Sequence, residues 1–194
     1  MFYRIKRVYP PEYYPGPTGP KRYFAGWYYK VVTEGRALAV IPGVSWAPSD
    51  SHSFIQTIDG ESGKTTYQRY GIDGFTYSKD RFEVRVADSV FSLEGMEVRT
   101  KALSVSLEFR DLVRWPTSLF SPGTMGWYSF VPFMECKHGI LAMDGSVHGT
   151  VDEVPAARGR IYIEKDYGRS FPQGWIWAQS NSFAEEGVSV SCSV

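Results

Sequence analysis

Apolar and polar residues alternate along most of the chain between residues 23 and 110, in short runs separated by turn residues. In residues 81–86, for example, Phe82, Val84 and Val86 alternate with arginine and glutamate. This period of two is typical of strands that have one buried and one exposed face. No stretch of this region has the 3.6-residue period of an amphipathic helix. The pattern therefore predicts an all-β fold, built as an antiparallel barrel or sandwich.

The predicted strands of this region follow one another at short spacing. They are residues 22–32, 37–46, 53–59, 65–70, 75–77, 81–88, 89–95, 96–100 and 104–109. The second is predicted to be broken at Pro42-Gly43, which is a signal for a turn. Asp59-Gly60 predicts a hairpin turn after the third.

Beyond Arg110 the pattern is less regular. Residues 112–125 are predicted to form a loop, and Gly126 is predicted to open a strand over 127–136. We expect that strand to turn at residues 137–139 into a second strand over 140–145. Charged and small residues at 151–159 separate it from strand-like segments at 160–183 and 188–194.

Three parts are predicted from this organisation. Residues 1–20, rich in proline, form an extended lead-in. Residues 21–152 form a first β-barrel or sandwich. Residues 153–194 begin a second, similar β unit that is only partly present, or supply the closing strands of a single domain.

The composition argues against some classes of function and predicts where the protein is found. The 194 residues carry 21 Lys and Arg against 21 Asp and Glu, and this zero net charge argues against binding of nucleic acid. Cys136 and Cys192 cannot build a disulfide framework, which favours a reducing compartment. The sequence has neither a signal peptide nor a membrane-spanning run. We therefore predict a cytoplasmic protein, with peripheral attachment to a membrane left open.

Common cofactor motifs are incomplete. Cys136, His138 and His148 do not complete the four ligands of a structural zinc site. The glycine pairs at 16–19 and 71–74 lack the strand-to-helix context of a phosphate-binding loop.

Several blocks of sequence resemble the tocopherol cyclase family, in the expected order along the chain. They are residues 23–28 (YFAGWY), 37–43 (ALAVIPG), 54–60 (FIQTIDG), 121–139 (SPGTMGWYSFVPFMECKHG) and 159–181 (GRIYIEKDYGRSFPQGWIWAQSN). The resemblance implies a fold similar to the lipocalin-like, two-barrel architecture of the carotenoid hydratases.

The chain departs from this family at a few positions. Family members usually have an acidic residue in place of Ala25 and a tryptophan in place of Tyr167, and often a histidine in place of Ser182. They also continue beyond the position where this chain stops. The resemblance therefore implies a relative that is short at its C-terminal end.

The activity that the resemblance implies is an isomerisation of an isoprenoid substrate, in which a phenol hydroxyl adds across a prenyl double bond. This chemistry requires a carboxylic acid held neutral by burial, or an imidazolium, to protonate carbon. It also requires aromatic rings beside the developing cation, a base for the phenol, and an apolar pocket. No metal or redox cofactor is needed.

The candidate acids are Glu135, Asp144, Glu164 and Asp166, and His138 lies in a family-like block. Each also has a structural interpretation. Glu135 fits a salt bridge on an edge strand, and Asp144 fits a hairpin turn. The Glu164–Asp166 charges, close to Arg169, fit ion pairs in a turn, and His138 fits a turn. We expect Glu135, Asp144 or Asp166 to be the proton donor.

The candidate substrate-binding residues are mainly aromatic and amide side chains. They are Trp127, Tyr128, Trp175, Trp177, Gln179, Asn181 and Arg169. The last tryptophans and amides alternate along one face of a predicted strand, which fits either a ligand site or core packing.

Two functions fit these residues. The first is a tocopherol cyclase-like enzyme that works by cofactor-independent acid–base chemistry on a prenylated lipophilic substrate. The second is a lipocalin-like carrier of a hydrophobic small molecule, without catalysis. A buried carboxyl group with a raised pKa distinguishes the enzyme from the carrier. A fragment that binds nothing is a third interpretation.

Overall fold

The structure is a computed structural model that describes residues 12, 14, 16, 17, 22–78, 80–118, 121–131, 133–185 and 187–193. Most of the predicted lead-in, residues 1–20, lies outside the described residues. In the described part, strands are joined by loops and two short 3₁₀ helices, which confirms the all-β class.

The elements are β1 (Tyr23–Thr33), β2 (Arg36–Trp46), β3 (His52–Asp59), β4 (Thr65–Tyr70), η1 (Ile72–Gly74), β5 (Phe75–Tyr77), β6 (Glu83–Val86), β7 (Ser89–Ser92), β8 (Gly95–Arg99), β9 (Ser104–Val113), η2 (Gly126–Phe130), β10 (Cys136–Ala142), β11 (Asp144–Val151), β12 (Val154–Pro155), β13 (Gly159–Gly168), β14 (Trp177–Ser180) and β15 (Val190–Ser193).

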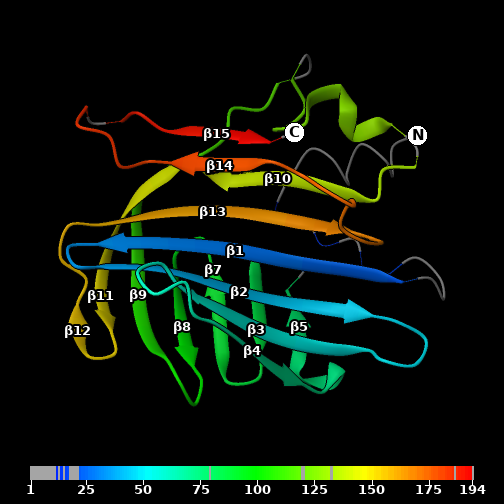
Figure 1. Cartoon of the computed structure of the whole chain (residues 1–194), viewed down its shortest axis with the longest axis horizontal. Helices are drawn as coiled ribbons and strands as arrows, with labels where there is room; N and C mark the ends of the chain where they lie inside the picture. Colours follow the sequence, from blue (N-terminus) through cyan, green and yellow to red (C-terminus); the bar gives the residue numbers. More distant parts are fainter. Residues whose placement is uncertain are drawn as a thin grey trace.

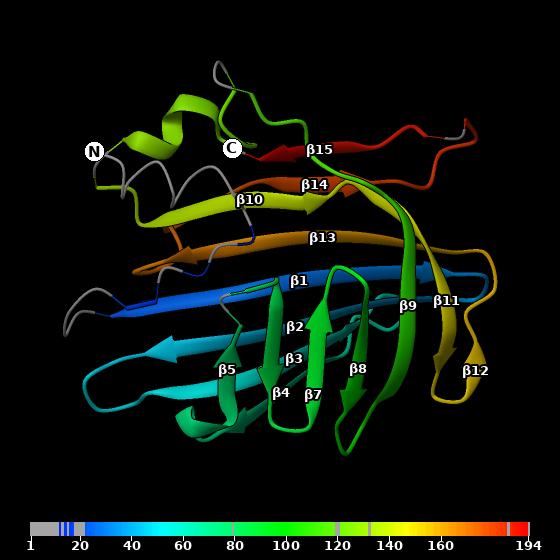
Figure 2. The same ribbon diagram turned by 180° about the vertical axis from the view of Figure 1, so that it is seen from behind.

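Thirteen strands form one curled antiparallel sheet, in the order β4-β3-β2-β1-β13-β11-β9-β8-β7-β6-β5. β12 pairs with β11. β10 and β11 both pair with the same edge of β13, β11 at its beginning and β10 along the rest. β1 to β4 and β13 cross the front of the view, and β5 to β9 run steeply behind them (Figures 1 and 2). β14 and β15 form a separate two-stranded sheet beside β10. β13 therefore lies at the centre of the molecule.

The inside of the curl is the main apolar core. β1 supplies Ala25, Trp27, Tyr29 and Val31 to it, and each is at most 1% exposed. These residues occupy alternate positions, so the period of two read from the sequence does set the buried face. The two end strands of the sheet, β4 and β5, do not pair with each other.

β13 is buried on both faces. Ile161 and Ile163 point into the main core. Tyr162 packs on the other face against Ile140 and Met143, in a second apolar cluster. Buried strands of this kind have continuous apolar runs rather than alternation, and β13 has such a run from Ile161 to Ile163.

The predicted break in the second strand is wrong, because β2 continues through Pro42 and Gly43. Pro42 has no backbone N–H to donate. The ladder between β1 and β2 is interrupted at this position, between the pairs Gly26–Gly43 and Tyr29–Val40, so no bond from Pro42 is needed. Gly43 lies under the ring of Phe54, which would collide with any side chain at this position.

The predictions for residues 111–139 also need correction. β9 continues to Val113, where a loop was expected. The expected strand over 127–136 is instead η2 and irregular chain, with φ of 54° at Gly126 and 76° at Phe133. The expected turn at residues 137–139 lies inside β10. On the edge of β10 away from β13, backbone N–H groups donate to side chains of this irregular chain. His138 N–H donates to Met125 Sδ, and Ile140 N–H donates to Thr124 Oγ1.

The division of the chain at residue 152 stays a prediction, although β13 belongs to the large sheet. Among the described residues, no helix has the length and apolar character needed to cross a membrane.

Candidate functional site

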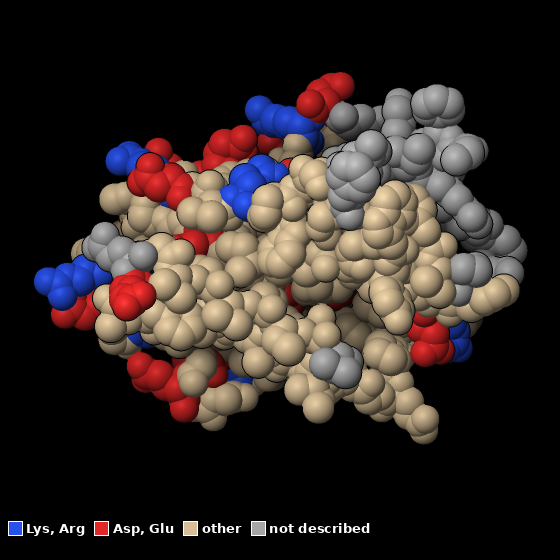
Figure 3. Space-filling model, turned by 90° about the horizontal axis from the view of Figure 1, so that it is seen from above, with Lys and Arg blue, Asp and Glu red and all other residues tan. Residues whose placement is uncertain are grey.

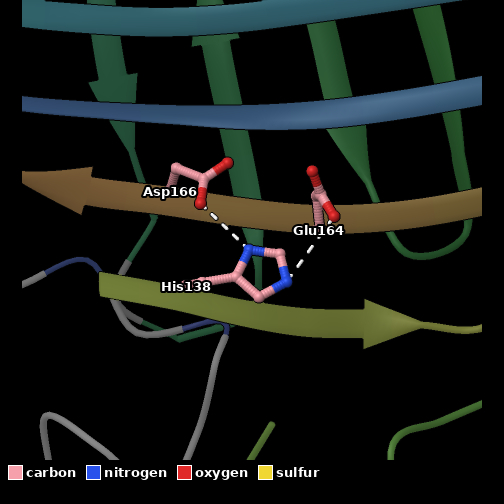
Figure 4. A group of neighbouring side chains, drawn as sticks. All are labelled: His138, Glu164 and Asp166. Atoms are coloured by element: carbon pink, nitrogen blue, oxygen red, sulfur yellow. Dashed lines mark hydrogen bonds and ion pairs between the residues drawn. The ribbon is translucent and has the colours of Figure 1, made fainter. Parts of the chain in front are cut away.

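The pairing of β10 with β13 brings one histidine and two carboxylates together. His138 lies directly opposite Asp166, and Glu164 comes two residues earlier on the same face of β13. The His138 ring lies between the two acids, with Nδ1 3.0 Å from Asp166 Oδ1 and Nε2 3.6 Å from Glu164 Oε2 (Figure 4). We call His138, Glu164 and Asp166 the triad.

Glu164 is the most buried member of the triad, with 5% exposed. Its Oε2 accepts a 2.6 Å bond from the Tyr162 hydroxyl and a 3.2 Å bond from the Trp177 indole. Burial raises the pKa of Glu164 to about 7, and the charge of Asp166 adds to this, against the opposing effects of His138 and the two donors. Close to neutral pH this carboxyl group can therefore carry a proton and release it.

His138 is held in a defined orientation. Nδ1 lies 3.0 Å from Asp166 Oδ1, and the tautomer in which Nδ1–H donates to this oxygen has Nε2 directed at Glu164. Burial opposes a charge on His138, but the hydrogen bond that His138 donates to Asp166 and the charges of both acids outweigh it and raise the pKa of His138. His138 Nε2 is buried without a hydrogen-bond partner among the described residues, and Glu164 Oε2 lies 3.6 Å from it.

Aromatic rings line the same face of the sheet. Tyr28 lies opposite Glu164 on β1, and its ring centroid is 5.5 Å from that of Trp177. The Tyr162 and Trp177 rings are 6.5 Å apart. Burial and the charge of Glu164 raise the pKa of Tyr28 to about 12, so its hydroxyl stays neutral. The acid group of the triad is therefore surrounded by neutral rings.

Asp144, another expected proton donor, is buried in interactions that hold the fold together. It is 3% exposed and forms a salt bridge with Arg160, whose Nε lies 2.9 Å from Asp144 Oδ1. Asn181 Nδ2 donates to the same oxygen at 3.0 Å and to the Ile161 carbonyl at 3.1 Å. These bonds attach the chain after β14 to β11 and β13.

The other candidates lie away from the triad, except Trp177. Glu135 is exposed and accepts a bond from Ser170. Arg169 is exposed, and its backbone N–H donates to the Glu135 carbonyl. Trp127, Tyr128 and Trp175 are also exposed. The amide atoms of Gln179 are buried without a hydrogen-bond partner among the described residues.

Sequence reasoning placed Glu164 among the acids but favoured a structural role for it, and it missed Tyr162 and Tyr28. The signal that could have found them is the run from Ile161 to Ile163, because a strand without alternation is buried on both faces. A carboxylate that continues such a run is then expected to be buried as well.

The triad also has the composition of a metal site. His138, Glu164 and Asp166 each offer one ligand atom, and these atoms lie within 4.8 Å of one another. However, Asp166 and Glu164 already accept hydrogen bonds from His138, Tyr162 and Trp177. This arrangement of donors favours proton chemistry.

The comparisons with known proteins identify the family. A family model described as tocopherol cyclase-like matches residues 65–193, which is more than half of the chain and includes the whole triad. The chain belongs to the tocopherol cyclase-like family.

Other comparisons add little to this family assignment. No match is found among curated proteins. One solved structure with a similar chain course is a candidate AttH protein of Nitrosomonas europaea, with 13% sequence identity and a TM-score of 0.45. The match covers 87% of this chain but 62% of the length of that protein.

Proposed function

We propose that this member of the tocopherol cyclase-like family closes a ring on a prenylated phenol, with Glu164 as the acid that protonates the double bond. The observation that carries the proposal is a carboxyl group that is 5% exposed and accepts hydrogen bonds from the Tyr162 hydroxyl and the Trp177 indole. Its burial raises the pKa of Glu164 to about 7. An acid with a pKa near the working pH is the most effective general acid. A carrier of hydrophobic molecules does not need such a group.

The first step is transfer of the Glu164 proton to the less substituted alkene carbon, which leaves a tertiary cation. The Tyr162 hydroxyl and Trp177 indole then stabilise the Glu164 carboxylate, because both already donate to its Oε2. The faces of the Tyr28 and Trp177 rings stabilise the cation, by on the order of 2 kcal/mol for a desolvated ring.

The second step is attack of the phenol oxygen on the cation. His138 Nε2 accepts the phenol proton while Asp166 holds Nδ1–H. The proton then passes from His138 to Glu164 across the 3.6 Å between them, so the triad returns to its starting state. No atom is lost or gained, and the overall reaction is an isomerisation.

The test is to incubate the full chain with a prenylated hydroquinone in D₂O and to detect chromanol by mass spectrometry. The product should carry one deuterium on the protonated carbon. Glu164→Gln keeps the shape and the accepted bonds but has no acidic proton, so we expect at least a roughly hundredfold loss of rate. Glu135→Gln, a carboxylate on the surface, is the matched control and should react as the wild type does.

Other outcomes decide against the enzyme. If Glu164→Gln retains the full rate, Glu164 is not the acid. If the wild type binds the hydroquinone without converting it, and Glu164→Gln binds it equally, the protein is a carrier of a hydrophobic molecule.

A further inference from the structure

Six large apolar side chains that are exposed belong to two segments that adjoin the same end of β10 and β13. They are Trp127, Tyr128, Phe133, Phe171, Trp175 and Ile176, each between 48% and 88% exposed. We call these six residues the apolar rim. Scattered exposed hydrophobic residues are normal, but several large ones in neighbouring loops mark an interaction surface.

Two segments distant in sequence form the rim, and they meet at the ends of the strands. The Arg169 backbone N–H donates to the Glu135 carbonyl at 2.8 Å, and Ser170 Oγ lies 3.3 Å from Glu135 Oε1. Both ribbon views place η2 and the connection from β13 to β14 at this same end of the sheet (Figures 1 and 2). The Phe171 and Trp175 rings are 5.2 Å apart, so the second segment is itself an aromatic cluster.

The rim has no charge of its own. Residues 115–134 and 170–183 contain no Lys, Arg, Asp or Glu. Seen from the side of β14 and β15, uncharged residues cover most of the surface, and a hollow near its middle has acidic atoms inside it (Figure 3). Where the two segments meet, the charged residues that directly flank them are an exposed acid, Glu135, and an exposed base, Arg169, so the rim has no excess of positive charge for an anionic partner. Trp and Tyr are the side chains that favour the boundary between lipid headgroups and hydrocarbon.

The rim is also next to the triad. Cys136 pairs with Gly168 at the rim end of the two strands, and His138 pairs with Asp166 two residues further along. At about 3.3 Å per residue, this step is roughly 7 Å. A single substrate with a long apolar tail would therefore be long enough to reach from the rim to the triad.

From these observations we propose that the apolar rim docks the protein on the surface of an uncharged lipid bilayer, from which it takes its substrate. The choice of a bilayer over another partner rests on the proposed function, since a prenylated phenol dissolves in lipid. The rim inserts its rings at the headgroup boundary, in the manner of a protein that lies on one leaflet.

The experiment is flotation of the full chain with large unilamellar vesicles of phosphatidylcholine, without substrate. We expect the protein to float with the vesicles and its tryptophan emission to shift to the blue. Because the six rim side chains are uncharged and the adjoining Arg169 is offset by Glu135, binding should change little between 50 and 500 mM salt or on addition of phosphatidylserine.

Matched variants locate the contact. Trp175→Ser with Ile176→Ser removes two exposed rim side chains and should lower the partition coefficient at least about tenfold. Val113→Ser with Val154→Ser removes two exposed apolar side chains outside the rim and should leave it unchanged.

Failure of the wild type to float, or equal partition of both double variants, would overturn the proposal. So would a dimer in light scattering that the rim variant dissociates, because the rim would then bind a second copy. Glu164→Gln should float as the wild type does. Flotation without ring closure would therefore reject the enzyme and retain the docking surface.

Discussion

Glu164 and Lys165 are neighbours in β13, and their side chains point to opposite faces of the sheet. Glu164 faces Tyr162 and Trp177, which donate hydrogen bonds to it. Lys165 is 1% exposed in the main core, with its Nζ 4.5 Å from the ring centroid of Tyr167 and 5.6 Å from that of Trp27. Burial alone lowers the pKa of Lys165 to about 7. One strand thus holds an acid and a base that both titrate near neutral pH, separated by the sheet.

At the residue scale, the orientation of His138 depends on Asp166. Asp166→Asn keeps an acceptor for Nδ1–H but removes a negative charge that raises the pKa of His138, so this pKa should fall. The measurement is an NMR titration of the three histidines. His52 and His148 do not contact Asp166 and serve as internal controls. An unchanged pKa of His138 would contradict the role of Asp166 as a positioning residue.

At the scale of elements, alternation in the sequence located the strands between residues 23 and 110, because each has one face in the core. The same reasoning failed between residues 126 and 139. Gly126 and Phe133 have positive φ there, and one edge of β10 bonds to the side chains of Thr124 and Met125. Local sequence does not encode such long-range partners.

The candidate site was predicted only in part for a related reason. His138 and Asp166 were both candidates, but which residues face each other depends on the register between β10 and β13. The short segment of Glu164, Lys165 and Asp166 has the charge of a surface turn. Only the cover that β10, β14 and β15 provide makes Glu164 a buried acid.

Asn181 is one of the residues that attach the hairpin of β14 and β15 to the large sheet, along with Trp177, and we predict that its amide contributes to the stability of the hairpin. Asn181→Ala leaves buried Asp144 and the Ile161 carbonyl each without one donor, at a cost of about 1–3 kcal/mol in the free energy of unfolding. Hydrogen exchange in residues 177–193 should become faster. Gln179→Leu is the matched control, since the Gln179 amide has no described partner to lose. Equal effects of the two variants would reject Asn181 as an anchor.

At the scale of the whole molecule, Lys165 makes stability depend on pH. Its pKa is about 7 in the folded chain against an ordinary value of 10.5, so the unfolded chain binds more protons between these values. The free energy of unfolding should therefore rise with pH above about 7, by up to about 1.4 kcal/mol per pH unit.

Urea unfolding at pH 7, 8 and 9 measures this slope, below the range in which the buried tyrosines titrate. Lys165→Met keeps the length of the side chain without the amine, so it should abolish most of the slope and stabilise the protein at pH 7. A variant with the slope of the wild type would show that another group is responsible.

Because β13 is made long after β1, one edge of β1 stays unpaired for a time during synthesis. β1 ends at Thr33, while its partner on one edge is complete only at Gly168. At ordinary rates of translation the ribosome needs roughly 10 s to make the chain between them. During that time an aromatic-rich strand has an open edge that can pair with other chains. The yield of folded protein in a cell is then governed by the protection of this strand during those seconds as much as by the stability of the finished sheet.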